Sequence, residues 1–148
     1  MNALRIRKAE QDDLRQLLEL YTYLHDNPFP VIDAPIENIW SRIISDTNHH
    51  IVLGFVDDVL VSSCVIVVID NLTQKQRPYA VIENVITHPD YRNLGYGLRV
   101  LSAAKDIAVQ NECYKMMLLT GSKEEATFDF YRRAGFNSND KTAFIQWL

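Results

Sequence analysis

The sequence has 148 residues, of which 47% are hydrophobic and 23% charged, so it is long enough for one packed domain and too short for two. Its formal net charge of -4 argues against a nucleic-acid partner, because nucleic-acid-binding proteins present basic surfaces, and it leaves room for a cationic amine. The longest apolar run, residues 64–69, is far too short to span a membrane, so we expect a cytoplasmic protein without a membrane partner.

The first fifty residues are predicted to form a strand and two helices. Apolar and basic residues alternate over residues 4–9, as they do in a half-buried strand. A helix follows with Asp12 and Asp13 at its start, where their charges suit the positive end of the helix dipole. A proline-rich loop separates it from a second helix, for which Asp33 is the expected N-cap.

The next forty residues are predicted to form three strands. Residues 51–56 and 59–69 are rich in apolar and β-branched side chains, and Asp57-Asp58 between them is typical of a tight hairpin turn. A polar loop over residues 70–78 leads to the third strand, residues 79–87.

The last third of the chain is predicted to alternate helices and strands. A helix is expected from about residue 98 to 110, a strand over 114–120, and a helix over 124–134 that Gly135 would end. A final strand is predicted over 143–148. A strand, a helix and a second strand in this order imply parallel pairing within a parallel or mixed sheet. The expected fold is therefore a single three-layer α/β domain.

The stretch RNLGYG, residues 92–97, lies between a predicted strand and a predicted helix. Glycine is common in such turns, so the motif alone is weak. A Rossmann fingerprint would need a third glycine where Val100 stands, and a P-loop would need Lys-Ser or Lys-Thr after the glycine, so both are rejected. What remains is a turn whose backbone amides, at a helix N-terminus, suit a phosphate, with Arg92 adding a charged contact.

This stretch resembles the R/Q-x-x-G-x-G/A signature of the GNAT superfamily of acetyl-CoA-dependent N-acetyltransferases. The resemblance extends to the preceding VIENVITHPDYR, to the later FYRRAGF and to the order of elements over the whole chain. VIENVI and Cys113-Tyr114-Lys115 are similar to the matching parts of glucosamine 6-phosphate N-acetyltransferases. The resemblance implies a single N-acetyltransferase domain over residues 1–148. Its central mixed, mostly antiparallel sheet would have about six to seven strands, with helices on both faces and a splay after the central strand.

The resemblance also implies acetyl-CoA as co-substrate. Its pyrophosphate would be held by the backbone across the glycine turn, at Arg92, Asn93, Leu94, Gly95, Tyr96 and Gly97. Its pantetheine arm would pair with the main chain of Val85, Ile86 and Thr87. Where many family members carry Asn seven residues before the helix tyrosine, this chain has Glu124. The histidines show no ligand spacing, and Cys64 and Cys113 are expected to be buried free thiols, so we expect no metal.

Glu83 is the first candidate for acid–base chemistry. By the two-residue period of a strand it would share a face with Val81, Val85 and Thr87, where a poorly solvated carboxylate would take up a proton readily. The alternative is a glutamate on the solvated side of an edge strand. The resemblance implies that Glu83 is the general base, directly or through water, and that Glu83 and Asn84 bind the substrate.

Tyr131 is the second candidate. It shares a helical face with Thr127, Phe130 and Ala134, so a core tyrosine is its ordinary interpretation. The resemblance implies that Tyr131 is the general acid that protonates the leaving thiolate, and that the backbone amide of Val85 polarises the thioester carbonyl.

The implied function is transfer of an acetyl group to the primary amine of a small molecule, by direct attack in a ternary complex. The loop YTYLHDNPFP between the first two helices would help to wall the acceptor pocket. An amino-sugar phosphate is one candidate acceptor, and antibiotics, polyamines, amino acids and protein amines remain open. The alternatives are a non-catalytic acyl-CoA-binding sensor and an enzyme that uses a longer acyl-CoA. A homodimer formed through the strand over 143–148 is also expected.

Overall fold

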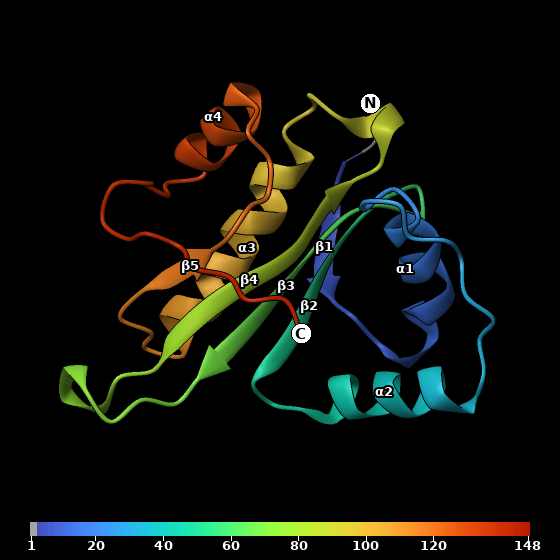
Figure 1. The fold of residues 1–148 in the computed structure, drawn as a ribbon. Helices are drawn as coiled ribbons and strands as arrows, with labels where there is room; N and C mark the ends of the chain where they lie inside the picture. The colour runs from blue at the N-terminus through green and yellow to red at the C-terminus, as the bar shows by residue number, and fades with distance from the viewer. Residues whose placement is uncertain (1–2) are drawn as a thin grey trace.

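The computed structural model describes residues 3–148 and shows one five-stranded sheet with helices on both faces (Figure 1). In their order across the sheet, the strands are β1 (Arg5–Lys8), β2 (His49–Val56), β3 (Val59–Ile69), β4 (Tyr79–Thr87) and β5 (Met116–Leu118). The helices are α1 (Leu14–Tyr21), α2 (Ala34–Ser45), α3 (Tyr96–Gln110) and α4 (Glu125–Arg133). Strands β1 to β4 pair antiparallel and β5 pairs parallel to β4, which confirms a mixed, mostly antiparallel sheet.

The predicted number of strands is wrong. Residues 143–148 form no strand, and their apolar side chains are exposed, with Phe144 at 91% and Trp147 at 84%. Strand β5 is also shorter than the predicted 114–120. An apolar pattern favours a strand, but a strand forms only where a neighbouring edge satisfies its backbone groups. Within residues 3–148 no such edge is paired with 143–148.

Several local signals are confirmed. Asp33 caps α2, its Oδ1 accepting a hydrogen bond from the Ile36 amide at 3.2 Å. Asp57 and Asp58 are both left-handed, with φ of 48° and 62°, as a two-residue turn of type I′ requires. Helix α3 begins at Tyr96 rather than near residue 98, because the glycine turn itself supplies its N-cap. No helix in the described part of the chain has the length and apolar character of a membrane span.

Helices α1 and α2 cover one face of the sheet and α3 and α4 the other (Figure 1), and a hydrophobic core fills the space on each side. The first core joins α3 to the sheet, and side chains of α4 pack against it. The second core joins α1 and α2 to the other face, around Leu17, Leu53 and Trp40. Any side chain on β3 or β4 therefore points towards one helical pair or the other, which makes the register of these strands decisive for the site.

The ladder between β3 and β4 is interrupted by a β-bulge. Ser63 pairs with Ile86 and Val65 pairs with Glu83, so Asn84 and Val85 together oppose one residue, and Asn84 is left-handed with φ of 50°. The extra residue changes the face of every side chain that follows. Glu83 shares the α1 side with its partner Val65, whereas Val85 packs into the α3 core. The prediction that Glu83 shares a face with Val85 and Thr87 is therefore wrong.

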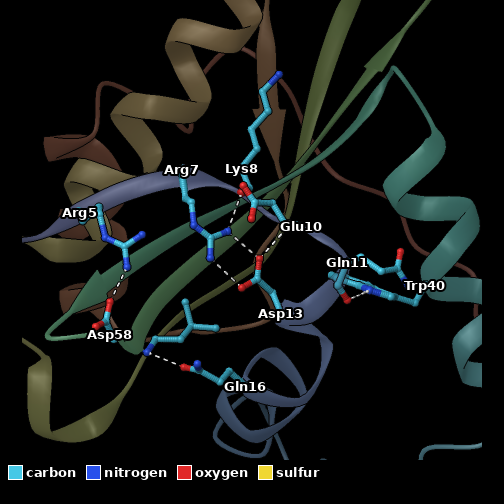
Figure 2. Close-up of polar contacts among 10 residues, drawn as sticks. Arg5, Arg7, Lys8, Glu10, Gln11, Asp13, Gln16, Trp40 and Asp58 are labelled. Carbon is cyan, nitrogen blue, oxygen red and sulfur yellow. Dashed lines mark hydrogen bonds and ion pairs between the residues drawn. The ribbon is translucent and has the colours of Figure 1, made fainter.

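A polar cluster holds the start of α1 against the sheet (Figure 2). The Arg7 guanidinium donates to both carboxylate oxygens of the buried Asp13, at 2.6 and 2.8 Å, and the Glu10 amide donates to the same carboxylate at 2.7 Å. Trp40 donates its indole N–H to the Gln11 carbonyl at 2.9 Å, which ties α2 to the same place. These bonds fix the position of α1, whose far end reaches the bulge.

The Asp13 carboxylate is expected to stabilise the fold in a pH-dependent way. The hydrogen bond from Arg7 lowers the pKa of Asp13, so its contribution is complete above the ordinary aspartate pKa and is lost as pH falls through the lowered one. Asp13→Asn should reduce the free energy of unfolding at neutral pH by about 2 kcal/mol, as measured by urea denaturation. The difference in unfolding free energy between Asp13→Asn and the wild type should become smaller as the pH is lowered. Asp58→Asn is the control, because its pair with Arg5 is exposed and should matter little.

Candidate active site

The candidate site lies where β5 stops pairing with β4. The two strands pair over Ala80 to Ile82 and Met116 to Leu118, and β4 then continues to Thr87. No strand in the described residues pairs with this side of residues 83–87. The separation agrees with the predicted splay and leaves backbone amides and carbonyls along β4 available to a ligand.

The glycine turn follows this free edge and leads into α3. Arg92 donates from Nε to the Thr87 carbonyl at 3.1 Å, which ties the turn to the end of β4. Asn93 and Gly95 are left-handed, with φ of 61° and 79°. A Cβ on Gly95 would meet nothing within 4 Å, so the backbone conformation rather than crowding requires glycine, and there is room for a ligand. The first amides of α3 have no intrahelical partner and suit an anion.

The other residues of the turn have different surroundings. The Leu94 side chain is exposed, whereas Tyr96 is buried in a small cluster with Val61. For Tyr96 only the backbone amide is therefore available to a ligand. Gly97 is packed tightly: a Cβ there would lie 3.0 Å from the Phe130 ring and 3.2 Å from Thr87 Oγ1. Its small size allows β4, α3 and α4 to meet.

Gly97→Ala is expected to destabilise the protein. The added methyl group would push against the Phe130 ring, and overpacking of this kind costs about 1–3 kcal/mol. Gly121→Ala is the matched control, because a Cβ at Gly121 would meet nothing within 4 Å. The measurement is chemical denaturation of both variants beside the wild type. Equal stabilities would mean that α4 can move away from α3 at little cost.

Glu83 and Tyr131 lie within electrostatic range of each other although they belong to different layers. Tyr131 is half-buried on α4 between the rings of Phe130 and Phe136, at centroid distances of 5.0 and 6.2 Å. Burial raises the pKa of Tyr131, and the neighbouring Cys64 and Glu83 raise it further, so the phenol keeps its proton at neutral pH.

Glu83 is exposed rather than poorly solvated. The prediction that apolar surroundings desolvate its carboxylate is therefore wrong, and the alternative, a glutamate on a solvated side of the strand, describes it. Asn84, beside it in the bulge, is also exposed. Both predicted substrate-binding residues thus present their side chains at the same point of β4.

The two cysteines are free. Cys64 is fully buried, with its thiol directed at the Val100 carbonyl at 3.9 Å, and burial raises its pKa to about 12, so it is a poor nucleophile. Cys113 is only half-buried, which corrects the expectation that both would be buried. Across residues 3–148 no cluster of three or more His, Cys, Asp or Glu side chains could hold a metal ion.

A cavity of about 560 Å³ lies beside α1 and the loop that follows it. Tyr23 and Phe29 from the loop line it, together with Arg15 and Glu19 of α1 and His88 after β4. The loop thus walls a pocket, as predicted. In the sequence, Tyr21 is the first residue of the predicted loop YTYLHDNPFP, and nothing there marks its hydroxyl, which the structure buries next to the bulge.

Comparisons with known proteins agree with this geometry. The profile of the acetyltransferase (GNAT) family matches residues 11–136. The chain is 27% identical over 143 residues to a glucosamine 6-phosphate N-acetyltransferase of Trypanosoma brucei brucei, covering 93% of this chain and 92% of the relative. A protein of Agrobacterium tumefaciens str. C58 described as an acetyltransferase has a TM-score of 0.89 and 32% identity, with 97% and 99% of the two chains covered. The glucosamine-6-phosphate N-acetyltransferase of Arabidopsis thaliana shares the fold with a TM-score of 0.86 at 20% identity, with 98% of each chain covered.

Proposed function

The chain belongs to the acetyltransferase (GNAT) family, as the resemblance of residues 92–97 indicated, and from this premise we propose that it acetylates the primary amine of a small molecule. Residues 1–148 would act as a single N-acetyltransferase domain, with direct attack in a ternary complex. The observation that carries the proposal is the free edge of β4 beside the glycine turn, with Glu83 and Tyr131 within electrostatic range of each other there.

The residues at this edge fit acetyl-CoA. When bound, acetyl-CoA supplies an acetyl group activated as a thioester. The backbone of residues 92–97 would hold the pyrophosphate, since the left-handed Gly95 leaves room in front of α3. The main chain of Val85, Ile86 and Thr87 would pair with the pantetheine arm. The Ile86 side chain is buried in the α1 core, which leaves its backbone for that role.

The side chains supply the proton transfers. Glu83 takes a proton from the ammonium, directly or through water, and Asn84 orients the resulting amine. The Val85 amide, displaced from the regular ladder by the bulge, donates a hydrogen bond to the thioester carbonyl. Tyr131 gives its proton to the leaving sulfur as the carbon–sulfur bond breaks, and the second proton that the nitrogen loses on becoming an amide passes to solvent. Glu83 and Tyr131 then return to their starting states by exchanging protons with solvent.

An amino-sugar phosphate is the first acceptor to test. The Trypanosoma relative is named for glucosamine 6-phosphate, and Arg15 at the cavity wall offers a cation to a phosphate. The experiment is a thiol-release assay with acetyl-CoA and longer acyl-CoAs over a panel of glucosamine 6-phosphate, spermidine, an aminoglycoside and an alanine-starting peptide. Amine-dependent release of thiol supports the proposal. Acetyl-CoA binding in calorimetry without any release would favour the non-catalytic sensor, and no binding would overturn both functions.

We also propose a homodimer that uses residues 143–148. This segment exposes Phe144, Ile145, Trp147 and Leu148, and exposed apolar patches of this kind usually mark an interface. The outer edge of β5 has no paired strand among the described residues, so the segment of a second copy could add to it. A variant lacking 143–148 should change from dimer to monomer in light scattering at micromolar concentration. A monomeric unmodified protein under the same conditions would overturn the dimer.

A further inference from the structure

Two buried hydroxyl groups beside the bulge have no hydrogen-bond partner within residues 3–148. They are Tyr21 Oη at the end of α1 and Ser63 Oγ on β3, and Ser63 is fully buried. Buried polar groups are almost always paired, because an unpaired one loses its hydration without replacement. The adjacent Ser62 shows the ordinary situation, since its hydroxyl donates to the Ile86 carbonyl at 3.1 Å and lies 2.8 Å from Thr87 Oγ1. Tyr21 and Ser63 are therefore candidates for a functional role.

Tyr21 Oη lies next to both Asn84 and Ser63. Contacts of hydrogen-bond type with these two side chains oppose the rise in the pKa of Tyr21, although their geometry is too loose for a regular hydrogen bond. Burial is the larger influence and raises the pKa of Tyr21 to about 12, so the phenol is neutral and can accept a hydrogen bond. Ser63 pairs with Ile86 on the α1 side of the sheet, directly beyond the bulge.

Asn84 connects these hydroxyls with the outside. Its side chain is exposed beside Glu83, and its left-handed backbone is a conformation that asparagine adopts more readily than most residues. A carboxamide has one donor end and one acceptor end. If the NH₂ group donates to Tyr21, whose hydroxyl also contacts Ser63, the oxygen is directed outward, where it can accept a hydrogen bond from an amine.

We propose that Tyr21 and Ser63 are positioning residues for Asn84, holding its carboxamide so that its oxygen receives the amino group of the acceptor. The inference rests on the proposed function and deepens it. It assigns the recognition of a primary amine to the α1 side of the bulge. Tyr131 and the glycine turn serve the donor from the α3 side.

The first test separates positioning from structural support by stability. Tyr21→Phe and Ser63→Ala each remove a buried hydroxyl whose contacts are too loose for a regular hydrogen bond, so each should lower the melting temperature less than Ser62→Ala does. Ser62→Ala removes a hydroxyl with two partners and should lower it, which makes Ser62 and Ser63 a matched pair. If the melting temperatures of Tyr21→Phe and Ser63→Ala fall as far as that of Ser62→Ala, the two hydroxyls support the fold, and the inference is overturned.

The second test uses kinetics and a double-mutant cycle. With the best amine of the panel, Tyr21→Phe should raise the KM for the amine about tenfold while leaving the KM for acetyl-CoA unchanged. Asn84→Gly removes the carboxamide and keeps the left-handed backbone. In that background Tyr21→Phe should have no further effect, because Tyr21 acts through Asn84. If Tyr21→Phe raises the KM for the amine as much in the Asn84→Gly variant as in the wild type, the inference is overturned. Tyr79→Phe, at the other end of β4, is the control.

A third measurement does not depend on turnover. In NMR, hydrogen exchange of the Asn84 side-chain amide should be about tenfold faster in Tyr21→Phe than in the wild type or in Tyr79→Phe. If the wild type acetylates no amine of the panel, the proposed function fails for those amines, and the exchange rate still decides the positioning. Unchanged exchange in Tyr21→Phe would overturn the inference even if the enzyme is active.

Discussion

Replacing Tyr131 with Phe is expected to lower kcat by about 10²- to 10³-fold, because the leaving thiolate loses its proton donor. The KM for acetyl-CoA should stay nearly constant, since the ring and its contacts with Phe130 and Phe136 remain in place. Steady-state kinetics at saturating amine make the comparison. Tyr114→Phe, outside the proposed site, is the control for loss of a phenol.

The pH profile adds a second readout for Tyr131. Burial, followed by the nearby Cys64 and Glu83, raises the pKa of the phenol, so its proton is retained through neutral pH and lost only in strong alkali. In the wild type, kcat should therefore fall on the alkaline side, and in Tyr131→Phe that limb should be absent. A variant with wild-type kcat and an unchanged profile would remove Tyr131 from the mechanism.

Glu83→Gln is expected to lower kcat/KM for the amine by about 10²-fold at neutral pH, where an alkyl amine is mostly protonated. The loss should shrink as pH rises, because an amine that is already neutral needs no base. Glu37→Gln, in the first turn of α2, is the control for the change of charge. If the kcat/KM of the variant is the same fraction of the wild-type value at every pH, Glu83 is not the base.

The same variant tests whether Glu83 and Tyr131 are neighbours. The Glu83 carboxylate raises the pKa of Tyr131, so its neutralisation should move the alkaline limb of kcat to lower pH. Two independent residues would show no such shift. This experiment measures the feature on which the proposed function depends most, the approach of α4 to the free edge of β4.

Much of the fold could be predicted because its signals are local. Strand β4 has the predicted ends, Tyr79 and Thr87, and Asp33 and the Asp57-Asp58 turn act as their residue types suggest. The glycine turn was recognised from six consecutive residues. In each case the structure depends on residues that are close together in the sequence, so a short sequence pattern is enough to predict it.

The predictions that were wrong concern contacts between distant segments. The strand over 143–148 needed an edge to pair with. Val85 and Thr87 were placed on the face of Glu83 because a bulge is formed by two strands together. Tyr21 and Ser63 are 42 residues apart in sequence, so no local pattern could bring their hydroxyls together beside the bulge.

The sequence by itself determined the family, the glycine turn for the donor and the residue types available for proton transfer, since these depend on short motifs. Only the tertiary structure decided which of these side chains meet. Glu83 stays on the α1 side with Val81, the bulge at Asn84 moves Val85 to the α3 side, and Tyr131 of α4 comes within electrostatic range of Glu83. The physical reason is that strand register and packing are set by long-range backbone pairing, which no single stretch of sequence contains.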